Sequence, residues 1–223
     1  AKSLTGIMTK MHLCKYRFGL TGTLDGTQTH QLVLEGLFGA VEKVVTTKEL
    51  IDKSTLADLK IKCIILKHPN IREKMTYAEE LEYLVTNEKR TDFVVNLLRH
   101  LRGNTLCLFQ LVEKHGKILN DRMKEEENVY FVYGGTDTSA REKIRGLVET
   151  HSKSTTIASF GVFSTGINIR NINNIVLASP SKSKIRVLQS IGRGLRTSSS
   201  KDSVLIYDIA DDISYNERRN FTL

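Results

Sequence analysis

Two arginines in the last part of the sequence have a spacing that would let both side chains bind the same phosphate. They lie in the segment QSIGRGLR, in which Arg193 and Arg196 are three residues apart and would share one face of a helix. A guanidinium is planar and permanently charged, and an arginine that reaches a γ-phosphate stabilises the charge that develops during phosphoryl transfer. The same spacing is also typical of a basic surface helix with solvated arginines, so the segment alone leaves both interpretations open.

Small polar residues after an apolar run form a second candidate site. Residues Ile157–Ile169 read IASFGVFSTGINI, and the hydroxyls of Ser164 and Thr165 stand where a strand would meet a loop. Hydroxyls and backbone N–H groups in such a loop can bind phosphate oxygens. The alternative is a purely structural loop in which Gly161 and Gly166 provide conformational freedom.

Two strand-to-helix turns form a third candidate. FQLVEKHG at 109–116 and YGGTDTSAREKIR at 133–145 would each place a helix N-terminus at one edge of a sheet, where phosphates bind readily. Arg141 adds positive charge to the second turn. Helix capping and a solvated helix face explain the same residues, so this signal too is open in isolation.

Threonines in GLTGTLD at 19–25 form a fourth candidate, because the hydroxyls of Thr21 and Thr23 can bond an acidic neighbour or shape a turn.

The sequence gives no support for other kinds of chemistry. The six histidines lack zinc-hydrolase spacing and the three cysteines lie far apart, so we expect neither a metal site nor a disulfide framework. No GxxxxGK[ST] loop occurs, although the arginine pair points to a nucleoside triphosphate.

Short apolar runs predict the elements that must position these residues. Five runs, bounded by polar or turn-forming residues, are read as strands: Thr105–Leu111, Val129–Tyr133, Thr155–Phe160, Asn174–Ala178 and Val204–Asp208. Helical patterns alternate with them over Val112–Glu126, Ser139–His151 and Lys184–Leu195. This alternation predicts an α/β fold, a parallel sheet covered by helices, with ligands at the carboxyl ends of the strands.

The segment before this array predicts an edge strand and two helices. The strand is Lys60–Lys67, and the helices are Tyr77–Val85 and Asp92–Leu101, with Thr76 and Thr91 as their N-caps.

Residues 1–45 fit the same domain poorly. A strand at Arg17–Thr21, a polar turn and a helix at Gln31–Phe38 look like the end of a preceding α/β domain. We therefore predict two parts, 1–50 and 51–223, with the boundary between Thr46 and Leu59.

Composition limits the partners and the compartment. Lys and Arg number 33 against 25 Asp and Glu, which gives a net charge of +8 and favours polyanion partners. No run approaches the ~20 apolar residues that span a bilayer, so we expect no membrane partner. The isolated cysteines indicate the reducing cytoplasm.

Taken in chain order, the segments of these four candidates resemble the second half of a superfamily 2 helicase or translocase. The correspondence runs from GLTGTL (motif III) through TLCLFQLVEKHG (motif IV), YGGTDTSAREKIR (segment IVa) and IASFGVFSTGINI (motif V) to QSIGRGLRT (motif VI). Each motif is weak alone, whereas the ordered set over roughly residues 16–210 is specific. The resemblance implies a RecA-like second motor lobe in 51–223, preceded by the tail of a first RecA-like lobe.

The resemblance also implies ATP with Mg²⁺ as the cofactor. Arg196 would be the arginine finger and Arg193 its partner on the γ-phosphate. Other residues that would line the nucleotide cleft are Gly166, Gln189 and Asn168, the last standing where many members carry an acidic residue. The phosphate-binding loop and the magnesium ligands belong to the family's first lobe, so we expect residues 1–223 alone to hydrolyse no ATP.

On the same resemblance, the polynucleotide partner is DNA, branched or at junctions of single strand and duplex. The residues that would hold its backbone are Lys114, Gly135, Arg141, Ser164 and Thr165. Thr21 and Thr23 would couple hydrolysis to lobe movement, with the first lobe of the same protein as partner. Bacteriophage helicases carry similar motifs. If this chain is encoded by a bacteriophage, the compartment is the cytoplasm of the infected cell.

Three other functions remain open from the residues. An RNA helicase would track a backbone in the same way, because the 2′-hydroxyl contacts that discriminate leave no sequence signature here. A non-catalytic nucleic-acid-binding module would not need two phosphate-directed arginines. A nucleotide-regulated protein adaptor fits the net charge less well.

Overall fold

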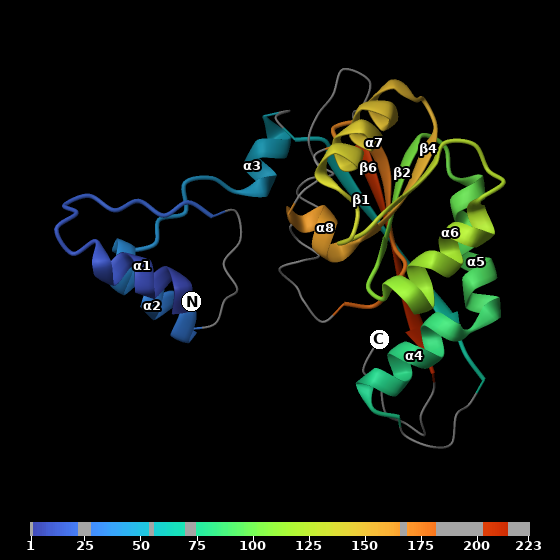
Figure 1. Cartoon of the computed structure of the whole chain (residues 1–223), viewed down its shortest axis with the longest axis horizontal. Coiled ribbons are helices and arrows are strands. Elements are labelled where there is room, and N and C mark those ends of the chain that lie inside the picture. Colours follow the sequence, from blue (N-terminus) through green and yellow to red (C-terminus); the bar gives the residue numbers. More distant parts are fainter. Residues whose placement is uncertain are drawn as a thin grey trace.

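A six-stranded sheet, parallel throughout, forms the centre of the molecule (Figure 1). The computed structural model describes residues 2–21, 28–53, 56–69, 75–165, 169–181 and 203–213. The strand order is β1-β6-β5-β2-β4-β3. The strands are β1 (Asp58–Lys67), β2 (Asn104–Phe109), β3 (Val129–Val132), β4 (Ser154–Ser159), β5 (Ile172–Leu177) and β6 (Ser203–Asp212). The predicted parallel sheet is thus confirmed.

Helices cover both faces of this sheet. They are α4 (Tyr77–Thr86), α5 (Glu88–His100), a π-helical turn η1 (Val112–Gly116), α6 (Lys117–Met123), α7 (Thr138–Thr150) and α8 (Phe160–Thr165). On one face, Leu98 of α5 and Leu119 of α6 pack with Phe109 in a buried apolar cluster. On the other face, Val148 of α7 packs with Leu106. The alternation of β2 side chains between the two clusters is the period of two that a strand requires.

Burial explains why the central strands are apolar along their whole length. Every residue of β2 and β4 is buried, because each strand has a neighbour on both sides and helices above and below. β1 lies at the edge, as predicted, and leaves Ile61 and Ile65 more than half exposed.

The predicted N-cap is correct for α4 and wrong for α5. Thr76 and Glu79 form a capping box at α4, in which the Thr76 amide donates to Glu79 Oε2 at 2.7 Å. For α5 the predicted cap, Thr91, is wrong. Asn87 caps the helix by accepting from the Arg90 amide at 3.0 Å, and Thr91 lies inside the first turn.

The amino-terminal part adds three helices: α1 (Lys2–Lys10), α2 (Gln28–Phe38) and α3 (Thr47–Asp52). The helix predicted at Gln31–Phe38 is confirmed as part of α2, whereas the strand predicted at Arg17–Thr21 is wrong. That segment pairs with no described strand, and Phe18 and Leu20 are 85% and 99% exposed. A strand needs a neighbouring strand for its backbone groups, and the described residues place none beside this segment. The helix predicted at Lys184–Leu195 lies outside the described residues.

Candidate nucleic-acid and nucleotide interface

The carboxyl ends of three neighbouring strands carry the predicted DNA-contacting residues. β2, β4 and β3 are adjacent in the sheet. Lys114 lies in η1 just after β2, and Gly135 lies in the turn after β3. Between them, β4 leads directly into α8, which contains Ser164 and Thr165. The topology therefore brings these segments to one edge of the sheet, as the sequence predicted.

Residues after β4 form a helix where the sequence predicted a loop. α8 begins at Phe160, immediately after the last residue of β4. Phe160 and Val162 are 3% and 5% exposed and pack into the cluster under α7, which favours an ordered turn of helix. The backbone of Ser164 and Thr165 belongs to this helix, and their side chains lie outside the description.

Lys114 has an ion-pair partner that the sequence did not predict. Its Nζ pairs with Oε1 of Glu82, which lies on α4, and both side chains are more than half exposed. An exposed pair of this kind contributes little to stability and exchanges readily with another anion. Lys114 can therefore contact a phosphate if Glu82 releases it.

The nucleotide-directed residues lie outside the described residues. These are Gly166, Asn168, Gln189, Arg193 and Arg196, together with Thr23. Thr21 is described, and it lies exposed in the irregular segment after α1.

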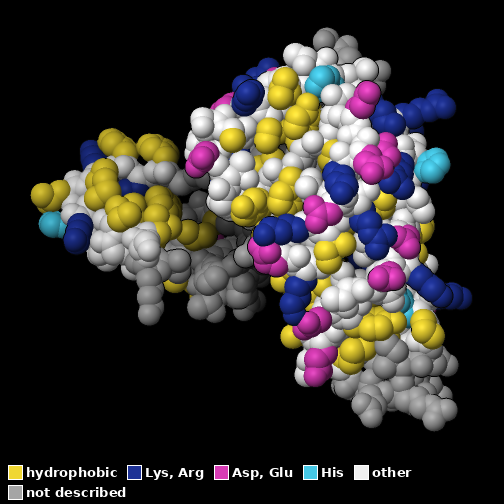
Figure 2. Space-filling model, turned by 45° about the vertical axis from the view of Figure 1, so that its right-hand side comes forward, with side chains coloured by type: hydrophobic (Ala, Val, Ile, Leu, Met, Phe, Trp, Pro, Cys, Tyr) yellow, Lys and Arg dark blue, Asp and Glu magenta, His cyan; other side chains and the backbone are white. Residues whose placement is uncertain are grey.

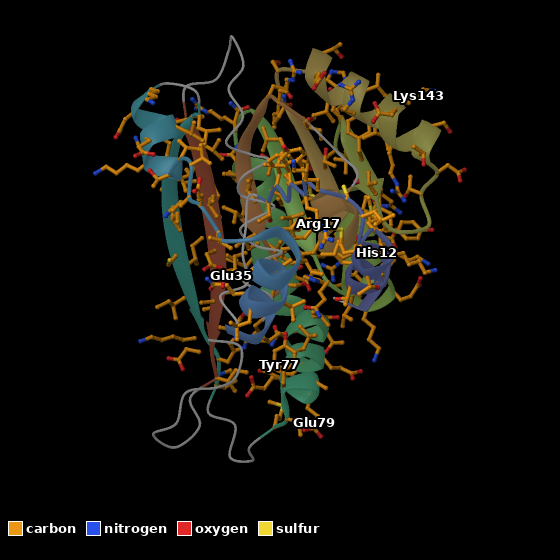
Figure 3. All side chains as sticks on the ribbon, turned by 90° about the vertical axis from the view of Figure 1, so that its left-hand side faces the viewer. His12, Arg17, Glu35, Tyr77, Glu79 and Lys143 are labelled. Carbon is orange, nitrogen blue, oxygen red and sulfur yellow. The ribbon has the colours of Figure 1, made fainter. Side chains whose placement is uncertain are left out.

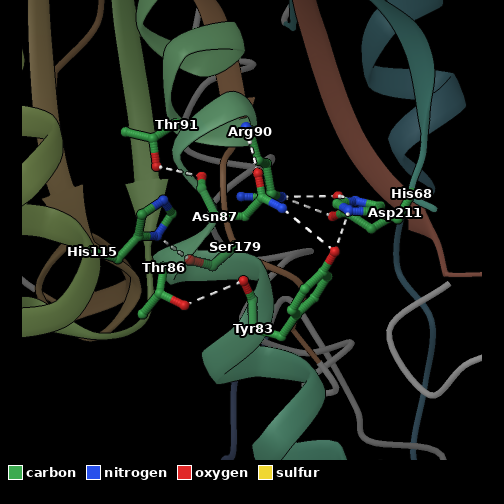
Figure 4. A network of polar contacts seen from close by, with 9 residues as sticks. All are labelled: His68, Tyr83, Thr86, Asn87, Arg90, Thr91, His115, Ser179 and Asp211. Atoms are coloured by element: carbon green, nitrogen blue, oxygen red, sulfur yellow. Dashed lines mark hydrogen bonds and ion pairs between the residues drawn. The ribbon is translucent and has the colours of Figure 1, made fainter. Parts of the chain in front are cut away.

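A buried charge network occupies the other half of the same edge (Figure 4). Asp211, near the end of β6, accepts from Nε of Arg90 at 2.9 and 3.0 Å. Nε2 of His68, just after β1, lies 2.8 Å from Oδ1 of the same carboxylate. Arg90 and Asp211 are each 1% exposed at the side chain, so this is a fully buried ion pair between α5 and β6.

A buried histidine lies on the other side of Arg90. Nδ1 of His115 in η1 is 2.8 Å from Oγ of Ser179, which follows β5, and Ser179 also accepts from the Gln110 amide at 3.2 Å. The pKa of His115 is lowered to about 3, first because burial disfavours the imidazolium and second because the positive charge of Arg90 is close. His115 is therefore neutral at physiological pH and joins the ends of β2 and β5.

Sequence reasoning missed this network because its members are far apart in the chain. Arg90 and Asp211 are 121 residues apart, and His115 and Ser179 are 64 apart. The one available signal was an acidic residue at the end of an apolar run, at Asp208–Asp212, which we interpreted as the end of the strand.

Charge on the visible face of the lobe is mixed rather than concentrated in one basic patch (Figure 2). Several surface arginines are paired with carboxylates. The pairs are Arg99–Glu126, Arg122–Asp92, Arg145–Glu142 and Arg145–Glu149. On the described helices these arginines are thus largely neutralised by neighbouring carboxylates.

Within the described ranges, no cluster of three or more His, Cys, Asp or Glu side chains is arranged to hold a metal ion. In the same ranges, none of the helices combines the length and the apolar character that crossing a membrane requires.

The buried state of His115 predicts a loss of stability in mild acid. An imidazole whose folded pKa is depressed stabilises the fold above its unfolded pKa of 6.5, and this stability is lost as the pH falls toward about 3. Between pH 7 and pH 5 we expect His115 to account for a fall of about 2 kcal/mol in the free energy of unfolding. Urea titrations at both pH values on the wild type and on His115→Asn, which keeps a polar group toward Ser179, measure the difference. Equal falls in both proteins would contradict the prediction.

The parallel sheet, its helices on both faces and the polar residues at its carboxyl edge define a RecA-like helicase motor lobe. Residues 88–198 match the helicase conserved C-terminal domain. The chain therefore belongs to the superfamily 2 helicases.

Two comparisons with the phage T4 helicase UvsW support this assignment. The chain is 36% identical over 219 residues to the ATP-dependent DNA helicase UvsW of Enterobacteria phage T4, which covers 94% of this chain and 43% of UvsW. The crystal structure of T4 UvsW matches all of this chain and 46% of its own, with a TM-score of 0.63 and 33% identity. The chain thus spans less than half the length of this relative.

A more distant structure shares the fold alone. The ATP-dependent Type ISP restriction-modification enzyme LlaBIII, solved bound to DNA, matches 92% of this chain and 15% of its own. Its TM-score is 0.54 at 14% identity.

Proposed function

We propose that this chain is the second motor lobe of an ATP-dependent DNA helicase that acts on branched DNA in recombination, repair and replication restart. The observation that carries the proposal is the domain match over 88–198, which contains both the glycine turn after β3 and the arginine pair. The identity of 36% to UvsW, named as an ATP-dependent DNA helicase, supports DNA as the substrate.

In this proposal, ATP binds between this lobe and a first lobe. Arg196 is the arginine finger, Arg193 supports it on the γ-phosphate, and Gly166, Asn168 and Gln189 line the cleft. The first lobe supplies the phosphate-binding loop and the Mg²⁺ ligands, so residues 1–223 by themselves turn over no ATP. Closure of the two lobes on ATP and reopening after hydrolysis would drive movement along DNA.

Residues 1–50 are proposed to be the tail of that first lobe, with Thr21 and Thr23 coupling hydrolysis to lobe movement. The exposed apolar side chains of this part support the idea, because Phe18 and Leu20 are almost fully exposed. Figure 2 shows hydrophobic side chains gathered over the α1 and α2 region. Exposed apolar surface of this kind is typical of a face that packs against another domain.

We propose that the DNA backbone runs across the carboxyl ends of β2, β4 and β3. Lys114, Ser164, Thr165, Gly135 and Arg141 follow these strands, and their adjacency in the sheet supports a single continuous contact surface. Contacts with phosphates alone would give no base preference.

The proposal predicts weak, sequence-independent and salt-dependent DNA binding by residues 1–223. If the strand ends neutralise about three phosphates of single-stranded DNA, log Kobs should fall with log[salt] with a slope of about −2. Affinity should then fall at least about tenfold between 50 and 200 mM salt. Fluorescence anisotropy with two unrelated DNA sequences, and with RNA of the same sequences, measures this.

The outcomes separate the alternatives. Affinity that stays constant with salt, or that depends strongly on base sequence, would argue against backbone tracking. Tighter binding to RNA than to DNA at every salt concentration would favour the RNA helicase.

A further inference from the structure

The turn between β3 and α7 is closed by two hydrogen bonds. The Thr136 amide donates to the Tyr133 carbonyl at 2.9 Å, and the Tyr133 amide donates to Thr136 Oγ1 at 3.1 Å. Its tip consists of Gly134 and Gly135, both exposed. Within the described part of the chain, no hydrogen bond from either glycine amide is seen, so both N–H groups are available to an anion.

Aromatic stacking fixes the base of this turn. A Cβ at position 135 would lie 2.7 Å from the ring of Tyr133, so only glycine fits without displacing that ring. Tyr133 lies 5.3 Å from the ring of Phe131, which stacks on buried Phe109 at 5.6 Å. The glycine tip is therefore attached to the core through three rings.

Arg141 reaches back from α7 to the same tip. Its Nη2 donates to the Gly134 carbonyl at 3.1 Å, and its Nε is buried with no hydrogen-bond partner among the residues that the structure describes. A bidentate contact with a phosphate uses two adjacent N–H groups of the guanidinium fork. Here the Nε side of the fork faces protein, so that side is closed to a phosphate, and Nη2 already donates one of its N–H groups to a backbone carbonyl.

We propose that Arg141 is a positioning residue, which holds the Gly134–Gly135 turn so that the backbone amides of the two glycines, and not the guanidinium, meet a DNA phosphate. The DNA phosphate as ligand rests on the proposed function, whereas the role of Arg141 in holding the turn does not depend on it. A charged donor on a carbonyl is a strong hydrogen bond, so its removal loosens the turn. Substitution of Arg141 removes no group that touches the phosphate, because the contact is made by the glycine amides.

Two variants of Arg141 separate positioning from direct contact. Arg141→Gln removes the charge but keeps an N–H donor on a long side chain, and Arg141→Ala removes both. We expect the Thr136 amide to exchange with solvent about tenfold faster in Arg141→Ala and nearly as in wild type in Arg141→Gln. We expect DNA affinity to follow the same order, with the salt slope unchanged in both variants.

Lys143→Gln is the matched control for charge. Lys143 lies two residues away on the exposed side of α7 (Figure 3), and its removal lowers the net charge equally without touching the turn. A direct phosphate contact predicts another pattern: in both Arg141 variants the slope becomes shallower by about 0.7 with single-stranded DNA, relative to Lys143→Gln. That result, with unchanged Thr136 exchange, would overturn the proposal.

The exchange measurement needs no DNA and therefore tests the positioning role separately. If residues 1–223 bound no DNA but Arg141→Ala still accelerated Thr136 exchange, the positioning role would stand and the proposed function would fail. Unchanged exchange in Arg141→Ala would reject the positioning role whatever the DNA result.

Discussion

Arg196→Ala in the intact two-lobed enzyme should lower kcat by about 10³–10⁵, which corresponds to roughly 4–7 kcal/mol of barrier. A finger acts chiefly when charge shifts on the γ-phosphate, so kcat should fall far more than the KM for ATP rises. Arg196→Lys should not restore activity, because an ammonium lacks the planar fork and the reach of a guanidinium. Arg193→Ala should also impair turnover, with a larger share of its loss in nucleotide binding.

Steady-state ATPase and salt-matched DNA binding on these variants provide the measurement. Arg145→Ala is a matched control, because Arg145 pairs with Glu142 and Glu149 on the surface of α7 and should leave turnover nearly unchanged. If the segment is merely a solvated basic helix, Arg196→Ala should slightly weaken DNA binding and leave turnover near normal. If Arg196→Ala retained more than about a tenth of the wild-type kcat, Arg196 would not be the arginine finger.

The sequence predicted the central strands well because local pattern and burial agree there. The predicted Thr155–Phe160 and observed Ser154–Ser159 differ by one residue, since this strand is a continuous apolar and small-residue run that is buried at every position. The start of α4 was equally predictable, because Thr76 and Glu79 satisfy each other within one turn of the chain.

Features that depend on distant residues could not be predicted. The strand Val204–Asp208 was predicted too short, because Asp208 and Asp211 are typical of a strand end. In the structure β6 pairs with β1 as far as Asp212, and buried Arg90 of α5 neutralises Asp211. Arg17–Thr21 failed for the opposite reason, because an apolar run predicts a strand only if a neighbouring strand exists to pair with it.

For the candidate site residues, the sequence predicted a shared carboxyl edge of the sheet, but neither the order of the strands along it nor what occupies the edge beside them. The shared edge follows from a parallel sheet, whereas the position of β4 between β2 and β3 is known only from the structure. The ion pair of Lys114 with Glu82 and the attachment of Arg141 to the Gly134 carbonyl depend on side-chain packing between elements. No spacing rule in one sequence contains that information.

Asp211→Ala should destabilise the fold by about 3–5 kcal/mol, because it leaves the guanidinium of Arg90 buried without its carboxylate. The substitution also removes the carboxylate that Nε2 of His68 contacts. Among the described residues, Nη1 and Nη2 of Arg90 are buried with no hydrogen-bond partner, so no second acceptor there compensates for the loss of the carboxylate. Urea unfolding of residues 1–223, followed by circular dichroism at pH 7, measures the free energy.

Asp92→Ala is the matched control, since Asp92 also pairs with an arginine, Arg122, but both side chains are about half exposed. Solvent screens that pair, and its loss should cost at most about 1 kcal/mol. A second comparison isolates the buried charge itself. The double variant Arg90→Met with Asp211→Leu removes both charges, and it should be more stable than Asp211→Ala, because the penalty arises from the unpaired ion rather than from the lost attraction. If the double variant were less stable than Asp211→Ala, the network would stabilise the lobe by its hydrogen bonds instead of by charge neutralisation. If Asp211→Ala cost no more than Asp92→Ala, the junction of α5 with β6 would not depend on this ion pair at all.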